Sequence, residues 1–303
     1  MSMKRFVGFI LVMVGILIFV QYQFGGSRKS EDYDRTWTFD NKELHELKIA
    51  TDNIGVDVKF VKSTDGSNSV RIVGRAREDI VDKIKSAELE GGRLDIDLNG
   101  KWHFGFSGFS EFRTSKQAVT VTLTDEAAKA LETLNISGDS SSLSVTGASV
   151  PNGSIKSDSG SIRLESIQGK ALSVKSDSGS IRLNDYEGDT LSMKSDSGSI
   201  RAENVIAEVK AASDSGSITI ERLRGTAELS SDSGHIELVK EDGTGANVKS
   251  DSGSVRIEVP ASYGGTYDLK SDSGSIREPD QRGTSSEVIK VRTDSGSIRV
   301  ERE

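Results

Sequence analysis

A heptapeptide, Ser-Asp-Ser-Gly-Ser-Ile-Arg, recurs through the second half of the 303-residue chain and limits its fold more than any other feature. It starts at Ser157 and returns, sometimes with one or two replacements, until a final copy that starts at Thr293. With a degenerate forerunner at 139–143 there are nine units, spaced 18 to 22 residues apart. Self-similarity at so narrow a period is typical of stacked repeat proteins. The Asp and Gly of the eight full copies are Asp158, Gly160, Asp177, Gly179, Asp196, Gly198, Asp214, Gly216, Asp232, Gly234, Asp251, Gly253, Asp272, Gly274, Asp294 and Gly296.

Each repeat contains two short segments in which apolar and polar residues alternate, with Ile162 and Leu164 on one face of the first. Two strands and two corners per repeat predict one coil of a parallel β-solenoid, about 4.8 Å from the next coil. We expect the corner glycine to supply a positive φ and the corner Asp to accept hydrogen bonds from backbone amides. The chain has 31 glycines and 46 serines, a content that alone would suit a disordered chain, and most of this excess is then explained by the repeated corners. The fold class is therefore all-β, with about nine coils over 131–303.

Charged residues flank the corners on both sides. The residues before each corner are Lys156, Lys175, Lys194, Ala212, Ser230, Lys249, Lys270 and Arg292. Those after it are Arg163, Arg182, Arg201, Thr219, Glu237, Arg256, Arg277 and Arg299. Stacking predicts Lys, Asp and Arg columns whose cations offset the repulsion among the Asp residues. The columns are either a charge-balanced solvated wall or a stripe that binds a repetitive envelope polymer. Calcium is disfavoured because the nonapeptide of calcium-binding β-rolls is missing.

The N-terminus carries an apolar run from Phe6 to Val20 after Lys4 and Arg5. A bilayer needs about 20 residues, and 21–24 extend the run to that length. No small-x-small cleavage site follows, so we predict an uncleaved transmembrane anchor over 1–24 rather than a signal peptide. A polar linker, 25–36, then leads to an extracytoplasmic remainder. The predicted location is the cell membrane, with a single pass.

Residues 37–130 are predicted to be rich in strands. Alternating segments occur at 46–50, 56–61, 69–76, 94–98 and 118–123, and helical patches at 80–87 and 126–134. Candidate binding residues in the loop that follows 94–98 are the aromatic side chains Trp102, Phe104, Phe106 and Phe109. They form a ligand or lipid patch, or else a strand edge that tucks its aromatics under the sheet.

The last repeats are the least regular, because insertions surround Tyr263, Tyr267 and the segment 278–283. Such insertions are binding loops or caps of the open end of a solenoid. In the second case Arg299, Glu301, Arg302 and Glu303 would oppose end-to-end pairing there.

Several chemistries are disfavoured. The chain has no cysteine, and its net charge of -8 gives no basic footprint for nucleic acid. Its three histidines lack metal-ligand spacing. Asp-Ser-Gly is also the active-site triplet of aspartic proteases, but that chemistry needs two such loops face to face. We therefore assign no catalytic, cofactor-binding or metal-binding residues and expect a protein that is not an enzyme.

The anchor, the segment Thr51–Val58 and the tandem corners occur together. This combination resembles a bacterial β-strand-repeat family of unknown function, labelled "putative adhesin", that includes the LiaG-like envelope proteins of Gram-positive bacteria. The resemblance covers about residues 45–303 and implies a membrane-tethered extracytoplasmic protein linked to envelope stress. We accordingly expect a binding or scaffold rod of the cell envelope whose partner is an envelope polymer or a membrane protein. The alternatives are an accessory regulator that contacts a membrane sensor and, third, a carbohydrate-active β-helix enzyme.

Overall fold

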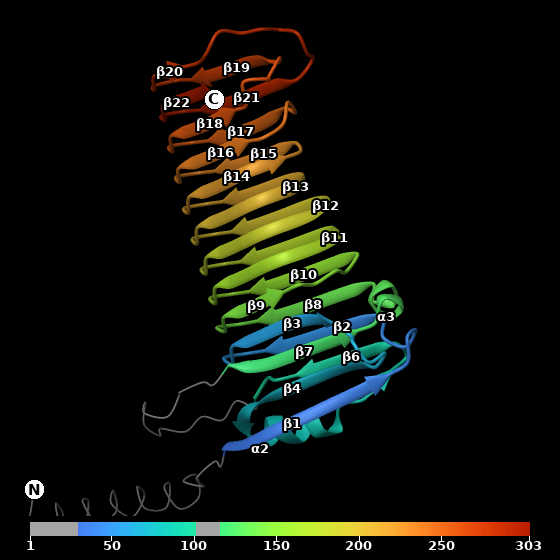
Figure 1. Ribbon diagram of the computed structural model, residues 1–303. Helices are drawn as coiled ribbons and strands as arrows, with labels where there is room; N and C mark the ends of the chain where they lie inside the picture. Colours follow the sequence, from blue (N-terminus) through green and yellow to red (C-terminus); the bar gives the residue numbers. More distant parts are fainter. Residues whose placement is uncertain (1–29, 101–115) are drawn as a thin grey trace, which may run out of the picture.

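The computed structural model describes residues 30–100 and 116–303. The expected membrane anchor lies outside the described residues, as do Trp102, Phe104, Phe106 and Phe109. Within the described ranges, 22 strands form one continuous sheet system wound into a long rod, with two short helices near one end (Figure 1). The predicted all-β class and β-solenoid are confirmed, whereas the transmembrane helix stays a prediction.

The middle of the rod follows the repeat directly. Its parallel strands are β8 (Thr133–Gly138), β9 (Leu143–Thr146), β10 (Asn152–Ser157), β11 (Ile162–Ser176), β12 (Ile181–Ser195) and β13 (Ile200–Ser213). The first half of β11 pairs with β9 and its second half with β10, so one long strand serves both sides of the rod. The register keeps like residues together, for example Ile162 beside Ile181. Four successive coils bend between their halves at a residue with φ of 55 to 59°: Ser166, Asp185, Asn204 and Arg222.

The C-terminal coils do not stack in sequence order. Their strands are β14 (Ile218–Arg224), β15 (Ala227–Ser231), β16 (Ile236–Lys240), β17 (Ala246–Ser250), β18 (Val255–Val259), β19 (Thr266–Ser271), β20 (Ile276–Arg277), β21 (Val288–Thr293) and β22 (Ile298–Arg302). Strand β21 pairs with β17 on one side and β19 on the other. Strand β22 likewise lies between β18 and β20. The last coil of the sequence is thus inserted beneath the coil that precedes it (Figure 1).

This order corrects one expectation about the open end. Arg299, Glu301 and Arg302 belong to β22, and Glu303 follows directly, so all four lie in the inserted coil. The end itself is formed by β19 and β20, which pair with one neighbouring coil each. If the coils stacked in sequence order, β21 and β22 would instead form the open end.

The first coil of the sequence is inserted in the same way. It consists of β2 (Glu46–Thr51) and β3 (Val56–Lys62), and the coil on its outer side consists of β6 (Arg93–Asp97) and β7 (Gln117–Leu123). Strand β2 pairs with β6 and β8, and β3 with β7 and β9. The described residues therefore stack eleven coils, two more than the repeat motif predicts. Their spatial order is β6–β7, β2–β3, β8–β9, β10–β11, β11–β12, β12–β13, β13–β14, β15–β16, β17–β18, β21–β22 and β19–β20.

Antiparallel strands and a helix close the N-terminal end. Strand β4 (Asn68–Arg77) pairs with β7, and β1 (Ser30–Phe39) pairs with β4, both antiparallel. Short β5 (Leu89–Glu90) pairs antiparallel with β6. Helix α2 (Glu78–Ser86) buries Ile80, Val81 and Ile84, and α3 (Asp125–Ala130) starts after Thr124, whose hydroxyl accepts from the Ala127 amide at 3.2 Å. Helix α2 confirms the patch predicted at 80–87, whereas the patch predicted at 126–134 is helical only as far as Ala130, because Thr133 and Leu134 already belong to β8.

The core is a set of columns of aliphatic side chains along the rod. The isoleucine that follows the corner is at most 1% exposed in Ile162, Ile181, Ile200, Ile218, Ile236 and Ile298. Ile276, the same position in the end coil, is 41% exposed because no further coil covers it. A chain with few apolar residues thus builds a continuous core by keeping them in register.

Candidate functional site

The first serine of each corner holds neighbouring coils together. In Ser176 the hydroxyl accepts a hydrogen bond from the Gly179 amide at 2.9 Å and donates to the Gly160 carbonyl, one coil earlier, at 3.3 Å. The side chain is fully buried, so both groups would otherwise be unsatisfied in the core. The equivalent hydroxyls that accept from their corner glycine are Ser157, Ser195, Ser213, Ser231, Ser250, Ser271 and Thr293.

The corner glycine is needed for close approach between coils. A Cβ atom on Gly179 would lie 2.0 Å from the carbonyl oxygen of Gly160, and one on Gly198 would lie 2.1 Å from that of Gly179. The expected positive φ was wrong, since the glycines with positive φ lie elsewhere in the described chain. Left-handed residues occupy the opposite bend, at positions such as Ser166.

The corner aspartates lie at the outer surface, and three of them, Asp177, Asp196 and Asp272, form ion pairs with the lysine two residues before. Lys175 Nζ lies 3.0 Å from Asp177 Oδ1, and Lys270 Nζ lies 3.1 Å from Asp272 Oδ1. The hydrogen bond to Asp177 and its charge raise the pKa of Lys175. The expected role of Asp as acceptor for corner amides was wrong, because the serine hydroxyl takes that role in these corners.

The aspartate column begins earlier than the repeat motif. Asp52 occupies the corner of the β2–β3 coil, and the Asp139 amide donates to the Thr51 carbonyl at 3.1 Å, as successive corners do. Partial burial, followed by the nearby charge of Asp139, raises the pKa of Asp52. Thr51-Asp52-Asn53 is therefore a corner that shares its Asp with all the later copies and its Thr with the last one, which starts at Thr293.

The flanking cations fall into two groups once the coils are placed in spatial order. We call the edge formed by the corners and their flanking columns the corner ridge. Its proximal basic block spans three consecutive coils and contains Lys156, Lys175, Lys194, Arg163, Arg182 and Arg201. Its distal basic block spans the last three coils and contains Lys249, Arg292, Lys270, Arg256, Arg299 and Arg277. The two coils between them carry Ala212, Thr219, Ser230 and Glu237 at these positions.

The two blocks differ in how many arginines are paired in the column after the corner: one of three in the proximal block and two of three in the distal block, where Arg277 forms no ion pair with a described residue. In the distal block Arg256 contacts Glu258 at 2.6 Å and Glu301 at 3.0 Å, and Arg299 also pairs with Glu301. In the proximal block Arg201 contacts Glu221 at 2.6 Å. Arg163 and Arg182 lie directly beside one another and form no ion pair with any residue in the described ranges. The proximal block thus presents exposed guanidinium groups without carboxylate partners.

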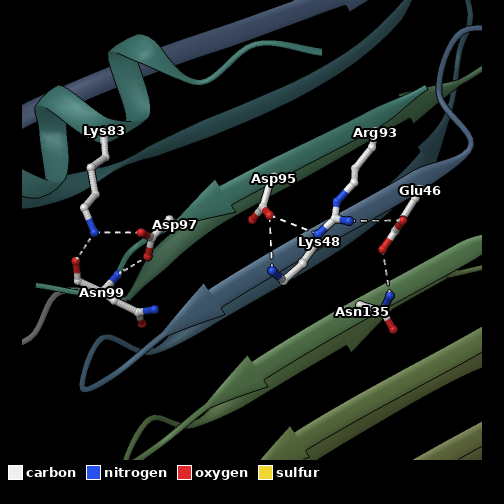
Figure 2. Close-up of polar contacts among 8 residues, drawn as sticks. All are labelled: Glu46, Lys48, Lys83, Arg93, Asp95, Asp97, Asn99 and Asn135. Atoms are coloured by element: carbon white, nitrogen blue, oxygen red, sulfur yellow. Dashed lines mark hydrogen bonds and ion pairs between the residues drawn. The ribbon is translucent and has the colours of Figure 1, made fainter. Parts of the chain in front are cut away.

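A separate polar network fixes the inserted N-terminal coil (Figure 2). Arg93 joins Glu46 and Asp95, at 3.8 and 3.1 Å, and Lys48 contacts Asp95 at 3.2 Å. The network extends across three strands, because Asn135 of β8 donates to Glu46 at 2.9 Å. In α2, Lys83 reaches Asp97 at 2.6 Å and the Asn99 carbonyl at 2.9 Å. These contacts connect β6, β2, β8 and α2, and no local sequence pattern predicts them.

The irregular C-terminal residues serve packing and capping. Tyr263 and Tyr267, the aromatic candidates for a binding loop, are buried against each other with ring centroids 5.6 Å apart. The loop between β20 and β21 crosses the end of the rod (Figure 1). Arg282 Nη1 donates to the Ala261 carbonyl at 2.7 Å, and Arg302 donates to the Asp280 carbonyl at 3.1 Å. The insertion therefore favours the capping interpretation.

One lysine, Lys240, is buried at the bend between β16 and β17. The Lys240 side chain has no solvent exposure, and its Nζ donates to the Gly225 carbonyl at 2.5 Å and to Thr244 Oγ1 at 2.9 Å. Asp242 lies 3.1 Å from the ammonium group. Burial lowers the pKa of Lys240, and the Asp242 charge partly opposes this effect. The cluster closes a corner that elsewhere is closed by apolar contacts.

Other chemical features of the described ranges are limited. An internal gap beside Leu134 and Leu172 has a volume of about 10 Å³, room for roughly one water molecule. No group of three or more His, Asp or Glu side chains is placed to hold a metal ion in residues 30–100 and 116–303. Over the same ranges, neither helix has the length and apolar character needed to cross a bilayer.

These features define a class of protein: a capped β-solenoid built from one repeated coil. The chain matches the family model described as Toastrack DUF4097 over residues 44–301 and belongs to that family. The family resemblance inferred from the sequence is thereby confirmed. A comparison with curated proteins finds no match.

A search of solved structures matches the chain to several bacterial proteins. A "putative lipid binding protein" of Parabacteroides distasonis is 20% identical, with a TM-score of 0.50, over 88% of this chain and 96% of its own. A "putative adhesin" of Bacteroides fragilis is 17% identical, with a TM-score of 0.43, over 90% and 98%. A "putative adhesin" of Parabacteroides merdae is 12% identical, with a TM-score of 0.29, over 92% and 98%. At 20% identity, the likeness to the Parabacteroides distasonis structure concerns the fold alone.

Proposed function

We propose that this protein is a non-enzymatic rod of the bacterial cell envelope that binds or scaffolds a linear envelope component along its corner ridge. The observation that carries the proposal is the in-register repetition of outward side chains over consecutive coils, as in Arg163 beside Arg182 and Lys175 beside Lys194. A row of identical groups about 4.8 Å apart suits a repetitive, extended partner better than a compact small molecule.

The orientation of the rod fits attachment at its N-terminal end. Strand β1 begins at Ser30 beside the antiparallel cap, so the predicted anchor over 1–24 would join the rod at that end. The coils would then extend away from the membrane, with the end coil β19–β20 most distant. In this arrangement the corner ridge faces the space outside the membrane along its whole length.

Cell fractionation and protease accessibility test the location. The full chain is expected in the membrane fraction, and protease added to intact protoplasts should degrade the rod. A variant that lacks residues 1–29 should leave the membrane fraction while keeping its β-structure by circular dichroism. A full chain recovered in the cytoplasm and protected from protease would contradict the proposal.

Crosslinking from the ridge tests the partner. A photoreactive residue in place of exposed Ser178, at a corner of the proximal block, should capture non-protein envelope material in intact cells. The matched control places it at Ser233, a corner between the two blocks. Capture of a single membrane protein at both positions would instead support the accessory-regulator alternative.

A further inference from the structure

The proximal basic block contains a column of like charges whose arrangement is unfavourable in the protein alone. Arg163, Arg182 and Arg201 stand side by side on adjacent parallel strands, in exact register with one another. Like charges directly opposite each other in a sheet are destabilising. Arg201 is relieved by Glu221 at 2.6 Å, whereas Arg163 and Arg182 have no ion-pair partner among the described residues. Arg163 and Arg182 therefore lack carboxylate partners, and the column they form could accept added anions.

Hydroxyl groups border this column. Ser161, Ser180 and Ser199 occupy the outward position between the corner and the arginines, and each is at least partly exposed. A guanidinium group presents a planar fork of donors that matches the oxygens of phosphate, and a serine hydroxyl adds a neutral donor. Each of these coils therefore presents the same pair of anion-binding groups, one serine hydroxyl and one guanidinium group.

The lysines on the other side of the ridge are better satisfied. Lys175 and Lys194 contact the corner aspartates Asp177 and Asp196 at 3.0 and 3.5 Å. The aspartate charges of these coils are consequently directed toward the lysine column. The arginine column is left as the side of the ridge on which an added anion meets the least compensated positive charge.

We propose that Arg163 and Arg182, with Ser161 and Ser180, form a binding site for a linear polymer that carries phosphate groups. The inference rests on the proposed function, which it deepens by naming the site and the ligand chemistry. Each phosphate accepts hydrogen bonds from one guanidinium group and its neighbouring hydroxyl. Successive phosphates then follow the column from coil to coil.

Binding of end-labelled inorganic polyphosphate to the full chain in detergent, measured by fluorescence anisotropy at several salt concentrations, tests this site. The double variant R163Q/R182Q should bind about tenfold more weakly or worse, since it loses two charge-assisted contacts. The matched control is R256Q/R299Q, which removes the same charge from the same column, but at arginines already paired with Glu258 and Glu301. The control should change the affinity by less than about threefold.

Thermal melting supplies the second readout. Without ligand, R163Q/R182Q should melt no lower than the wild type, because it loses a like-charge contact and no ion pair. Polyphosphate should raise the melting temperature of the wild type and leave that of R163Q/R182Q unchanged. Free phosphate and neutral dextran should have neither effect, which separates a polymer from a single phosphate and from a carbohydrate.

Three outcomes would overturn the inference: no wild-type binding at physiological salt, equal loss in both double variants, or unchanged binding in R163Q/R182Q. None of them depends on where the protein resides. A chain that binds polyphosphate through these arginines but proves to be cytoplasmic would overturn the proposed function and leave the site intact. A protein that resides in the envelope but does not bind polyphosphate would overturn the site and leave the proposed function intact.

Discussion

The amide of Ser273 donates a hydrogen bond to the carbonyl of Asp294, 2.9 Å away, so the last corner of the sequence lies beneath the one before it. The Ser295 amide in turn bonds to the Asp251 carbonyl at 3.0 Å. The C-terminal coil is therefore held on both sides, as is the first coil, β2–β3. Because neither the first nor the last coil of the sequence is an end of the stack, releasing either coil would require breaking two interfaces rather than one.

The coil order predicts different costs for the same substitution at two copies of one motif position. Ile298→Ala should lower the free energy of unfolding by about 2–5 kcal/mol, because Ile298 is 1% exposed between two coils. Ile276→Ala should cost about 1 kcal/mol or less, because that side chain is 41% exposed at the end of the rod. Urea denaturation measures both. A larger cost at Ile276 would indicate stacking in sequence order.

Much of this fold can be read from the sequence, and the limits are physical. Alternation and period predict strands such as β2 and β3 and the coil itself. They do not predict which coil lies next to which, because every copy offers nearly the same apolar columns. The choice between neighbours is made by the lengths of connections, such as the long segment between β20 and β21, and by side-chain contacts across coils, such as Arg256 with Glu301.

Replacing the buried serine of a corner should lower the free energy of unfolding, whereas replacing the exposed serine of the same corner should not. Ser195→Ala removes the acceptor for the Gly198 amide, at 2.9 Å, and the donor to the Gly179 carbonyl, at 3.4 Å. Both groups remain buried, so we expect a loss of about 1–3 kcal/mol. Ser197→Ala, at the exposed serine of the same corner, should stay within about 0.5 kcal/mol of the wild type. Equal effects in chemical denaturation would contradict the hydroxyl column.

The corner glycine predicts a steric effect independent of φ. Gly179→Ala places a Cβ 2.0 Å from a backbone oxygen, which the neighbouring coil can relieve only by moving. We expect a loss of at least about 1–3 kcal/mol in the free energy of unfolding. Gly243→Ala is the matched control, because its Cβ would have nothing within 4 Å and its φ is not positive. Comparable melting temperatures for the two variants would argue against close coil contact at the corner.

The candidate site was only partly predictable from the sequence. The motif places Arg163 and Arg182 in one column, but their lack of partners depends on side-chain contacts across coils. Tyr263 and Tyr267 lie in the least regular repeat of the sequence, and they are buried because the inserted coil packs against them. Asp52 is not recognisable from the motif as a corner of the ridge, because Asn53 and Ile54 replace the Ser and Gly of the later copies.

An exposed turn predicts one component of the acid sensitivity. Asp65 accepts hydrogen bonds from the Ser67 hydroxyl, at 2.7 Å, the Ser67 amide, at 3.0 Å, and the Ser63 hydroxyl, at 3.1 Å, and these lower its pKa from 3.8 to about 2. A carboxyl group with a lowered folded-state pKa stabilises the fold above its unfolded pKa, and that contribution disappears as the pH falls through the folded pKa. Asp65→Asn should therefore be less stable than the wild type at neutral pH.

The difference should shrink between about pH 4 and pH 2 and vanish below that range. Urea denaturation of both proteins across this range measures it. Asp232→Asn, at an exposed corner aspartate that forms no ion pair with a described residue, controls for a general effect of removing a negative charge. A gap between Asp65→Asn and the wild type that persists unchanged at pH 2 would show that these hydrogen bonds do not favour the charged form.

Disulfide formation between engineered cysteines tests the inserted coil most directly, and the chain has no native cysteine to interfere. Ser254 and Ser297 hold equivalent outward positions in adjacent coils, since the Val255 amide donates to the Ser297 carbonyl at 2.9 Å. Ser275 lies one coil further along, because the Ile298 amide donates to its carbonyl at 2.9 Å. A disulfide needs Cα atoms about 4.4–6.8 Å apart, which neighbouring coils meet and alternate coils do not. Under mild oxidation S254C/S297C should close to an intramolecular disulfide, seen by intact mass and non-reducing electrophoresis, while S254C/S275C stays reduced. Closure of S254C/S275C with S254C/S297C left open would contradict the coil order.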